Sequence, residues 1–538
     1  MKGFSNEYTY TKFAEKGDEQ RFDALFDGAV EKAKREILGK RFPMYINGKE
    51  AYSSGELEER SPIDGAIVGR FQLGTKEHAQ EAIESARAAF PEWSQTDYSK
   101  RIAIFRKAAE IFRERKFLIA AIMSLENGKT RYESVGEVDE AIDFLNYYSM
   151  DMERNKGYVV RNRIGGSTSK VSAGFQGAPG KEEKVSIVMR PYGVFGVIAP
   201  FNFPISISTG MCTGALITGN TVVFKPSSTD NMTMLTGLYL YGVFKDAGLP
   251  DGVLNYVTGP GSVVGEELVT NPKVSGIAFT GSRKTGMAMM AKTYGMGMQK
   301  VFVVELGGKN PSIVSKHANL DEAVTGIVSS AFGYAGQKCS ACSRVYVHEA
   351  VKEEFISKLA EKVRGLKKGN PLIKENYVGP LISKPALDRF VSSVEEAKQQ
   401  GRIIVGGNTV QTEQGTYVEP TVAELGHQNR LFHEELFVPF LVVDSFKGFA
   451  EAVAKANDVE YGLTAGLYSR NRGEIKAFLS GVEAGVMYVN REIGATTGAI
   501  VGAHAFVGWK GSGTTGKGTG SRFYLQQFMR EQSQSVTK

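Results

Sequence analysis

The pattern of apolar and polar positions divides the chain into a helical first part and a longer second part in which strands and helices alternate. Between residues 76 and 154, apolar side chains recur at spacings of three and four, for example at Ile102, Phe105, Ala109 and Phe112. On a helix this spacing gathers the apolar side chains on one face. We therefore predict an amphipathic helical layer over this stretch.

From Pro191 onward, short β-branched runs that end in Gly, Pro or Asn alternate with segments of helix length. The first series of expected strands covers residues 194–199, 221–225, 253–257, 274–279 and 301–305. A second series follows Asn310 and covers residues 343–347, 403–405, 441–443, 466–468 and 486–489. This alternation is typical of parallel α/β sheets, which bind ligands beyond the carboxyl ends of their strands. We expect a cofactor at those ends, near Asn202, Lys225 and Glu305.

A polar, glycine-rich stretch over residues 161–184 separates the helical layer from the first strand series. It is too long for a tight turn, so we expect a protruding hairpin or arm. The 538 residues also exceed the roughly 250 to 300 at which one hydrophobic core stops growing, so at least two packed domains are expected.

Composition and charge exclude several classes of protein. With 42% hydrophobic and 23% charged residues, the chain is close to the globular average. Its net charge of +6 comes from interleaved basic and acidic residues, which form no basic stripe for nucleic acid. No apolar run reaches the roughly 18 residues that span a bilayer, and no secretory signal is visible. The 3 cysteines, an odd number, argue against a disulfide framework. We expect a cytoplasmic enzyme with no nucleic-acid or membrane partner.

Cys339 is the first candidate for chemistry. It follows Gly336 and Lys338, and a helix start there would lower the pKa of the thiol below its usual value of about 8.5. Two alternatives stay open: a buried structural cysteine, or a Cys-x-x-Cys pair with Cys342 for redox chemistry or metal binding. A tetrahedral metal site needs four ligands, and the 6 histidines include no close pair at ligand spacing, so no metal is predicted.

Two further residues follow predicted strands. Glu305 ends an apolar strand before two glycines, so burial should raise the pKa of its carboxyl towards a value useful to a general base. Asn202 lies between Pro200 and Pro204, where a rigid amide can donate to an oxyanion. The ordinary alternatives are a solvated acid in a loop and a turn asparagine beside proline.

Glycine-rich turns over residues 259–261 and 279–286 follow two of the strands and suit a dinucleotide. Neither has the G-x-G-x-x-G fingerprint, so each is a weak signal alone. The prediction depends on their combination with the other motifs.

Taken in order, these segments resemble the aldehyde dehydrogenase superfamily from about Pro43 to Gly513. The motifs that carry the resemblance are Pro200-Phe201-Asn202, Lys225-Pro226-Ser227-Ser228, Phe279-Thr280-Gly281-Ser282, Glu305-Leu306-Gly307-Gly308-Lys309, Gly336-Gln337-Lys338-Cys339 and Glu434-Glu435-Leu436-Phe437. The separation of 34 residues between Glu305 and Cys339 also matches the family's spacing. The resemblance implies that Cys339 is the nucleophile, Glu305 the general base and Asn202 an oxyanion donor.

The same resemblance implies an α/β fold in three parts. These are a Rossmann-type dinucleotide-binding domain over residues 1–157 and 191–304, an α/β catalytic domain over 305–513, and a β oligomerisation arm over 158–190 and 514–538. It thereby implies a homo-oligomer built from dimers.

NAD is the cofactor that the resemblance implies. Lys225 would hold the adenosine ribose, Gly281 and Ser282 would face the pyrophosphate, and Glu435 with Phe437 would hold the nicotinamide ribose and ring. The full set of implied cofactor contacts is Ile198, Pro200, Lys225, Ser228, Gly261, Gly281, Ser282, Leu306, Glu435 and Phe437. Because Ser228 replaces a glutamate that often repels a 2′-phosphate in NAD-selective relatives, some use of NADP is expected.

Within the superfamily, residues 337–344 and 497–502 resemble the subfamily that oxidises L-glutamate γ-semialdehyde, which is in equilibrium with 1-pyrroline-5-carboxylate, to L-glutamate in proline degradation. By this likeness Ser340, Gly498 and Ala499 would bind the α-carboxylate, since backbone N–H groups and a hydroxyl form a small anion nest.

The likeness also implies that Phe203 and Phe506 flank the aliphatic chain of the substrate and that Glu137 contacts its ammonium group. The chain departs from the family's pattern at Val438, which replaces a usual glycine, and over residues 490–496, which form a longer segment. Two alternatives stay open: another semialdehyde or an aliphatic aldehyde as substrate, and a non-catalytic binding protein of the same fold.

Overall fold

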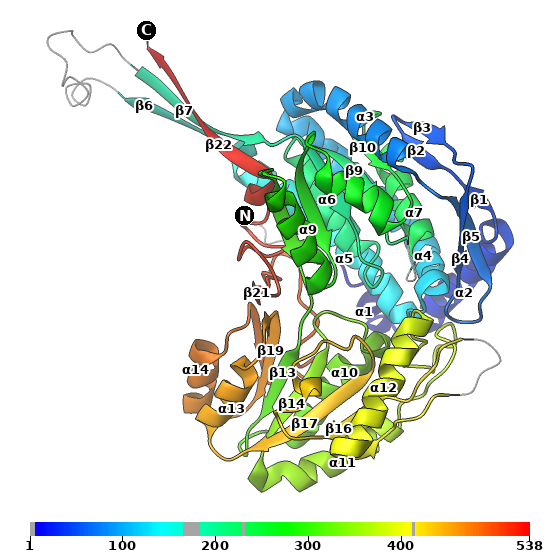
Figure 1. Ribbon diagram of the computed structural model, residues 1–538, viewed down its shortest axis with the longest axis vertical. Helices are drawn as coiled ribbons and strands as arrows, with labels where there is room; N and C mark the ends of the chain where they lie inside the picture. Colours follow the sequence, from blue (N-terminus) through cyan, green and yellow to red (C-terminus); the bar gives the residue numbers. More distant parts are fainter. Residues whose placement is uncertain (1–5, 165–182, 229–231, 411–414, 538) are drawn as a thin grey trace, which may run out of the picture.

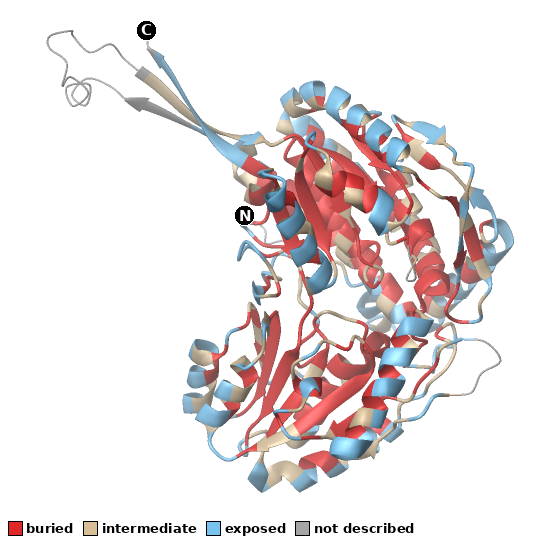
Figure 2. Ribbon diagram, viewed as in Figure 1, coloured by how far each residue is buried: buried red, intermediate tan, exposed pale blue. Residues whose placement is uncertain are grey.

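A computed structural model describes residues 6–164, 183–228, 232–410 and 415–537. Two large sheets with their helices form two bodies, and a narrow β arm projects away from them (Figure 1). In Figure 2 the strands of both sheets are buried, and exposed residues lie mainly on the outer helices and the arm.

The first seven-stranded sheet has the order β12-β11-β8-β9-β10-β2-β3. Its strands are β12 (Val301–Glu305), β11 (Val274–Thr280), β8 (Val194–Ile198), β9 (Thr221–Lys225), β10 (Leu254–Tyr256), β2 (Met44–Ile46) and β3 (Lys49–Ala51). The first five in this order run parallel to one another, and each agrees with a predicted strand to within one residue at each end. The first strand series is therefore confirmed.

Helices cover both faces of this sheet because alternate residues of each strand point to opposite sides. On β9, Val222 and Phe224 join the core that includes α4, α5, α6 and α7, whereas Val223 joins the core that includes α3. The helices of this body are α3 (Lys76–Gln95), α4 (Tyr98–Asn127), α5 (Arg131–Arg154), α6 (Ser206–Ile217), α7 (Met234–Asp246), α8 (Glu266–Thr270) and α9 (Arg283–Gly295).

Helices α3, α4 and α5 form the helical layer that the apolar spacing predicts. Their starts are capped by side chains that accept backbone N–H groups: Thr75 before α3, Asp97 before α4 and Thr130 before α5. Two helices that the sequence analysis did not predict, α1 (Thr9–Ala14) and α2 (Glu19–Glu36), precede them.

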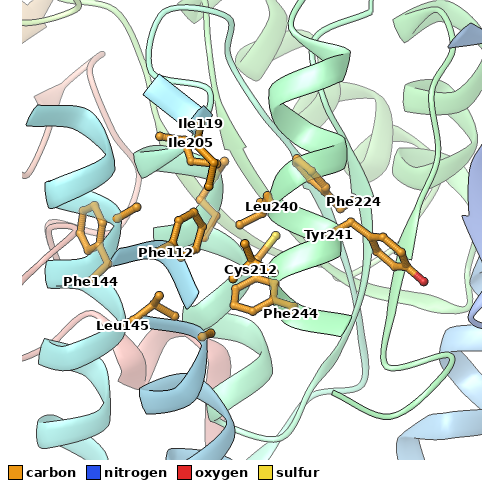
Figure 3. Packing of buried hydrophobic residues seen from close by; sticks show 14 of the residues in the cluster. Phe112, Ile119, Phe144, Leu145, Ile205, Cys212, Phe224, Leu240, Tyr241 and Phe244 are labelled. Atoms are coloured by element: carbon orange, nitrogen blue, oxygen red, sulfur yellow. The ribbon is translucent and has the colours of Figure 1, made fainter. Parts of the chain in front are cut away.

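Cys212 lies in the apolar core of this body, between α6 and its neighbours. Figure 3 shows its side chain beside Leu240 and Phe244, with Phe112 and Ile205 close by. The residue is fully buried, and burial raises the pKa of its thiol. Cys212 is therefore a structural cysteine.

The second seven-stranded sheet has the order β15-β16-β17-β14-β13-β19-β20. Its strands are β15 (Arg402–Val405), β16 (Thr421–Glu424), β17 (Phe440–Phe446), β14 (Cys342–His348), β13 (Asn310–Val314), β19 (Thr464–Tyr468) and β20 (Val486–Val489). Only β15 is antiparallel to its neighbour. The second predicted series is confirmed, but β13 and β16 are additions to it.

Two layers of helices enclose the second sheet. Helices α10 (Leu320–Phe332) and α11 (Lys352–Arg364) pack on one face, where Val345 and Val347 point. The opposite face, which includes Tyr346, is covered by α12 (Lys384–Gln400), α13 (Phe449–Asn457) and α14 (Arg472–Gly481).

The arm is a three-stranded antiparallel sheet of order β22-β7-β6. It consists of β6 (Val159–Ile164), β7 (Glu183–Pro191) and β22 (Met529–Thr537), and Figure 1 shows it extending beyond both bodies. The predicted hairpin is thus present, although residues 165–182 lie outside the described part of the chain.

Two smaller sheets complete the fold. One pairs β1 (Arg41–Phe42) and β4 (Glu56–Arg60) with β5 (Ile67–Gln72), and the other pairs β18 (Tyr461–Gly462) with β21 (Trp509–Lys510). Among the described residues, no helix is long and apolar enough to span a bilayer.

Candidate functional site

Cys339 lies in a tight turn between the 3-10 helix η3 (Gly333–Gly336) and β14. The backbone enters this turn through three left-handed residues, Tyr334 (φ 50), Ala335 (φ 50) and Gly336 (φ 68). Left-handed backbone costs non-glycine residues about 1–3 kcal/mol each and persists only where contacts impose it. A Cβ at Gly336 would lie 2.6 Å from the carbonyl oxygen of Val438, so only glycine fits there.

Buried amides on both sides hold this turn in place. The side-chain Oε1 of Gln337 accepts the N–H of Ile382 at 2.8 Å, and its Nε2 donates to the carbonyl of Pro380 at 3.2 Å. The amide of Asn310 donates to the carbonyls of Cys339 at 2.7 Å and Ala341 at 2.9 Å. The sequence analysis missed Asn310 as a positioning residue, although it directly follows the Glu305–Lys309 motif.

Asn202 reaches the same turn from the other body. It follows β8, is almost fully buried, and donates from Nδ2 to the carbonyl of Gln337 at 3.1 Å. The two residues are 135 positions apart in the chain. The structure thus brings Asn202 and Cys339 to one place, as the motifs predict.

Glu305 ends β12 and meets residues near the end of the chain. Its backbone forms an antiparallel bridge with Gly513, and the N–H of Gly508 donates to its carboxylate. The other carboxylate oxygen, Oε2, is buried and has no hydrogen-bond partner among the described residues. Burial raises the pKa of this carboxyl well above its ordinary value, in the direction that the sequence predicts.

Glu435 approaches the turn that follows Glu305. Its Oε1 accepts the N–H of Gly308 at 2.8 Å. A Cβ at Gly307 would lie 2.2 Å from the carboxylate, and one at Gly308 would lie 2.4 Å from the carbonyl oxygen of Cys339. The two glycines therefore permit a close approach that no other residue allows. Burial raises the pKa of Glu435 to about 7.

The expectation that a helix start lowers the pKa of Cys339 is wrong. Cys339 lies in a turn before a strand, and its surroundings raise the pKa of the thiol to about 12. Burial is the largest cause, followed by the negative charges of Glu435 and Glu305, whereas the N–H groups of Ser340 and Cys339 act in the opposite direction. The resting thiol is thus protonated at neutral pH, and a neighbouring base has to remove its proton.

Cys342 differs from Cys339 in its surroundings. It is 1% exposed, lies at the start of β14, and directs its sulfur to the carbonyl of Arg344 at 3.8 Å. Burial raises the pKa of its thiol to about 12 as well. All three cysteines are free, so the alternative of a Cys339–Cys342 disulfide is not observed in this structure.

The predicted cofactor residues gather at the carboxyl edge of the first sheet. Lys225 is almost fully buried; its Nζ and the hydroxyl of Ser228 both donate to the carbonyl of Pro226, at 3.1 and 2.9 Å. Burial lowers the pKa of Lys225 to about 8.

Ser282 is the exposed N-cap of α9, where its hydroxyl accepts the N–H of Thr285. Five other members of the set lie along the same edge: Ile198 at the end of β8, Pro200 after it, Gly261 before α8, Gly281 after β11 and Leu306 after β12. The last two members, Glu435 and Phe437, precede β17 in the second body.

The predicted carboxylate anchor lies beside the Cys339 turn. The hydroxyl of Thr496 donates to the carbonyl of Ser340 at 2.7 Å, which joins the 496–499 loop to the residue after the thiol. Arg491 donates to the carbonyls of Thr497 at 3.0 Å and Gly498 at 2.5 Å. Among the described residues, the N–H groups of Gly498 and Ala499 have no partner. Thr496 and Arg491 are positioning residues that the sequence analysis missed.

The longer segment over residues 490–496 is anchored on α10. The N–H of Ala495 donates to the carbonyl of Gly326 at 2.9 Å, and that of Thr496 donates to the hydroxyl of Ser330 at 3.0 Å. The other departure, Val438, is 4% exposed and packs in the core of the second body. Neither departure disrupts the Cys339 turn.

Glu137 is paired inside the fold. One oxygen pairs with Lys129 and the other accepts the N–H groups of Ile205 at 2.8 Å and Ser206 at 3.2 Å. The residue is 2% exposed, and its carboxylate supports the start of α6. Its contact with the ammonium group of the substrate stays a prediction.

The two predicted aromatic residues lie on different elements. The ring of Phe203, after β8, lies 3.6 Å from the Nζ of Lys129, a cation–π contact. Phe506 exchanges backbone hydrogen bonds with Thr519, at 3.1 and 2.9 Å. Both side chains are half-buried.

Comparison with known proteins gives the class of this enzyme. The sequence model described as the aldehyde dehydrogenase family matches residues 50–533, and the chain belongs to that family. The predicted fold class is thereby confirmed.

Among its relatives, 1-pyrroline-5-carboxylate dehydrogenase 1 of Halalkalibacterium halodurans is 36% identical over 533 residues, 98% of each chain. The corresponding enzyme 2 of Bacillus subtilis is 37% identical over 492 residues, 90% of this chain and 91% of that one. A solved structure of 1-pyrroline-5-carboxylate dehydrogenase from Thermus with bound NAD superposes with a TM-score of 0.90 at 32% identity and covers 100% of both chains.

Proposed function

We propose that this aldehyde dehydrogenase oxidises L-glutamate γ-semialdehyde, in equilibrium with 1-pyrroline-5-carboxylate, to L-glutamate with NAD as the oxidant. The observation that carries the proposal is the Thr496–Ser340 hydrogen bond, which places a loop with free N–H groups beside Cys339. An aldehyde held by the thiol at one end would therefore meet an anion nest at the other. The names of the Halalkalibacterium and Bacillus relatives support the same substrate.

The residues at the carboxyl edge of the first sheet, together with Glu435 from the second body, fit NAD. The exposed N-terminus of α9 offers backbone N–H groups to a pyrophosphate, Lys225 offers a buried ammonium to a ribose, and Glu435 offers a carboxylate to the second ribose. No side chain crowds the outer side of Gly261, where a Cβ would meet nothing within 4 Å. When bound, NAD supplies the acceptor for the hydride. The neutral hydroxyl of Ser228 supports some use of NADP.

The first half of the reaction forms a bond between the Cys339 sulfur and the aldehyde carbon. A neighbouring carboxylate takes the thiol proton, and the oxyanion that forms accepts hydrogen bonds from the Asn202 amide and the N–H of Cys339. Loss of hydride from the adduct leaves a thioester on Cys339. The strained turn, held by Asn310 and Gln337, keeps the sulfur in position for both steps.

Hydrolysis of the thioester requires a base that can accept a proton near neutral pH. Glu305 fits this role because its Oε2 is buried with no hydrogen-bond partner among the described residues and because burial raises the pKa of its carboxyl above the ordinary value. It would take a proton from water as the water oxygen attacks the thioester carbon. L-Glutamate and the free thiol are then released.

Steady-state kinetics with two aldehydes of equal length test the substrate. With NAD, we expect kcat/KM for L-glutamate γ-semialdehyde to exceed that for the carboxylate-free aldehyde by at least about 100-fold, since a site built to hydrogen-bond a substrate group rejects an analogue that lacks the group. Equal efficiencies would remove the carboxylate anchor and favour the alternative, an enzyme for aliphatic aldehydes. No turnover of either aldehyde would favour a non-catalytic binding protein.

We further infer that the parts of the chain have separate roles. Residues 1–157 and 191–304 form the dinucleotide-binding domain, residues 305–513 the catalytic domain, and residues 158–190 with 514–538 the arm that assembles a homo-oligomer from dimers. Exposed valines on the arm support the last role: Val160 on β6 is 54% exposed and Val536 on β22 is 60% exposed. The free thiols support a reducing compartment, the cytoplasm.

A further inference from the structure

Two imidazoles and one carboxylate form a cluster outside the site described above. His427 follows β16, His433 follows the 3-10 helix η5 (Arg430–Phe432), and Asp458 is the C-cap of α13. One potential ligand atom from each residue lies within 4.8 Å of those of the other two. The sequence analysis did not find this group because the fold, and not a short spacing, brings α13 against the segment after β16.

The hydrogen bonds of His433 fix which ring nitrogen is free. Its Nε2 lies 2.9 Å from the carbonyl oxygen of His427. Since a carbonyl oxygen can only accept, Nε2 carries the hydrogen, and Nδ1 of the neutral ring has a lone pair. The second nitrogen of a metal-ligating histidine is commonly held in this way by a backbone carbonyl.

The hydrogen bonds of His427 have the same form. Its Nδ1 lies 3.0 Å from the hydroxyl of Tyr346, and its Nε2 lies 2.9 Å from Oδ2 of Asp458. The Tyr346 hydroxyl can donate to the carbonyl of Lys455 at 3.2 Å, which leaves its oxygen free to accept from Nδ1. Nε2 can then present a lone pair towards Asp458, an arrangement that a cation between them would stabilise.

We propose that His427, His433 and Asp458 bind one divalent transition-metal cation of the zinc class. The ligands are Nε2 of His427, Nδ1 of His433 and a carboxylate oxygen of Asp458, with a further position for water. Two imidazoles and one carboxylate suit Zn²⁺, Co²⁺ or Ni²⁺ better than Mg²⁺ or Ca²⁺. Binding replaces the His427–Asp458 hydrogen bond, and the single ring hydrogen moves from Nε2 to Nδ1, where the Tyr346 oxygen accepts it.

The position of the cluster suits a cation that exchanges with solvent. His427 is 8% exposed and ties the site to the protein interior through Tyr346, whereas the Asp458 side chain is 62% exposed. A bound cation would join the segment after β16 to the end of α13. The folded protein should therefore gain stability from the metal, because the unfolded chain lacks the site.

Titration of the full chain with Co²⁺, followed by visible absorption, tests the proposal. We expect one Co²⁺ per chain, displaced by Zn²⁺, with a spectrum that lacks a thiolate-to-cobalt charge-transfer band. The affinity should fall at least ~10-fold in His433→Ala and in Asp458→Asn, and about 10- to 100-fold in Tyr346→Phe, which removes only the hydroxyl behind His427. His317→Ala, a change of an exposed histidine outside the cluster, should bind Co²⁺ normally.

Thermal unfolding with Zn²⁺ gives an independent readout. The melting temperature of the unaltered chain should rise with Zn²⁺, and that of Asp458→Asn should not; this substitution is exposed and nearly isosteric, so its fold is kept. The proposal is overturned if no saturable binding occurs, if His433→Ala and Asp458→Asn bind as the unaltered chain does, or if a thiolate band places the metal on a cysteine.

Discussion

At the scale of single residues, the reactivity of Cys339 is set by two neighbouring carboxylates. Burial and the charges of Glu435 and Glu305 all disfavour the thiolate. Burial in turn raises the pKa of both carboxyls, to about 7 for Glu435 and well above the ordinary value for Glu305. The thiol of Cys339, the proposed nucleophile, therefore stays protonated until a base acts on it.

The Glu435→Gln substitution tests this electrostatic coupling. Removing the negative charge should lower the pKa of Cys339 by about one unit, the usual effect of a nearby charge. The pH profile of Cys339 alkylation by iodoacetamide should then move to lower pH. The difference should appear only above about pH 7, because below the pKa of Glu435 its carboxyl is already neutral.

Glu434→Gln is the matched control for that measurement. Glu434 is the exposed neighbour of Glu435, pairs with Arg430, and is not among the main causes of the raised pKa of Cys339. Its profile should match the unaltered chain. Superimposable profiles for Glu435→Gln and the unaltered chain would show that the two groups are not coupled.

At the scale of elements, the ends of the parallel strands hold the site, and loops complete it. The strands β8 to β12 could be predicted because their β-branched runs are buried on both faces and end at Gly, Pro or Asn. Strand β13 escaped prediction because it contains Pro311 and directly follows a loop motif, and β16 escaped because Ala423 and Glu424 follow only two β-branched residues. The sequence of either segment alone does not show which strands will flank it in the sheet.

The same limit applies to the candidate site. Asn202, Glu305 and Cys339 could be predicted from motif order and spacing. The turn at Cys339 could not, because its left-handed residues are imposed by contacts with Val438, Asn310 and Ile382 from distant parts of the chain. The contacts of Glu137 with Lys129 and the backbone of α6 could not be predicted either, because these groups come together only in the fold.

The Gly498→Ala substitution tests the anchor loop. Gly498 has a φ of 82, and an added Cβ would lie 3.2 Å from Nη2 of Arg491, so the loop must shift. We expect KM for L-glutamate γ-semialdehyde to rise about 10-fold while KM for NAD stays constant, because a left-handed alanine costs about 1–2 kcal/mol.

Gly502→Ala provides the control, since Gly502 has a φ of 80 in the same region but is not part of the anchor. It should cost similar stability and leave both KM values unchanged. An unaltered KM in Gly498→Ala, or equal increases in the two variants, would separate the loop from substrate binding.

At the scale of the whole molecule, the arm projects beyond the two bodies (Figure 1). Within the described part of the chain, its outer strands β6 and β22 each have one unpaired edge, and such edges readily pair with another chain. Covering the exposed valines of the arm would remove apolar surface from water. Both features support the proposed assembly through the arm.

Substitution of the arm valines tests this assembly. In the double variant Val160→Glu, Val536→Glu, the mass measured by light scattering should fall to that of a smaller species. The reason is that assembly through the arm would bury two charges without partners. Val391→Glu, on α12 and 40% exposed, should keep the mass of the unaltered chain. A monomeric unaltered chain, or an unchanged mass in the double variant, would refute the role of the arm.

The central claim is that Cys339 forms the covalent bond with the aldehyde, and the turnover of Cys339→Ser tests it most directly. With L-glutamate γ-semialdehyde and NAD, kcat should fall at least ~10³-fold, because a hydroxyl at this position is a far weaker nucleophile. NAD binding should be retained, and Cys342→Ala, a change of the buried cysteine nearby, should keep most of its activity. Activity of Cys339→Ser within tenfold of the unaltered chain, or loss of activity in Cys342→Ala alone, would contradict the account.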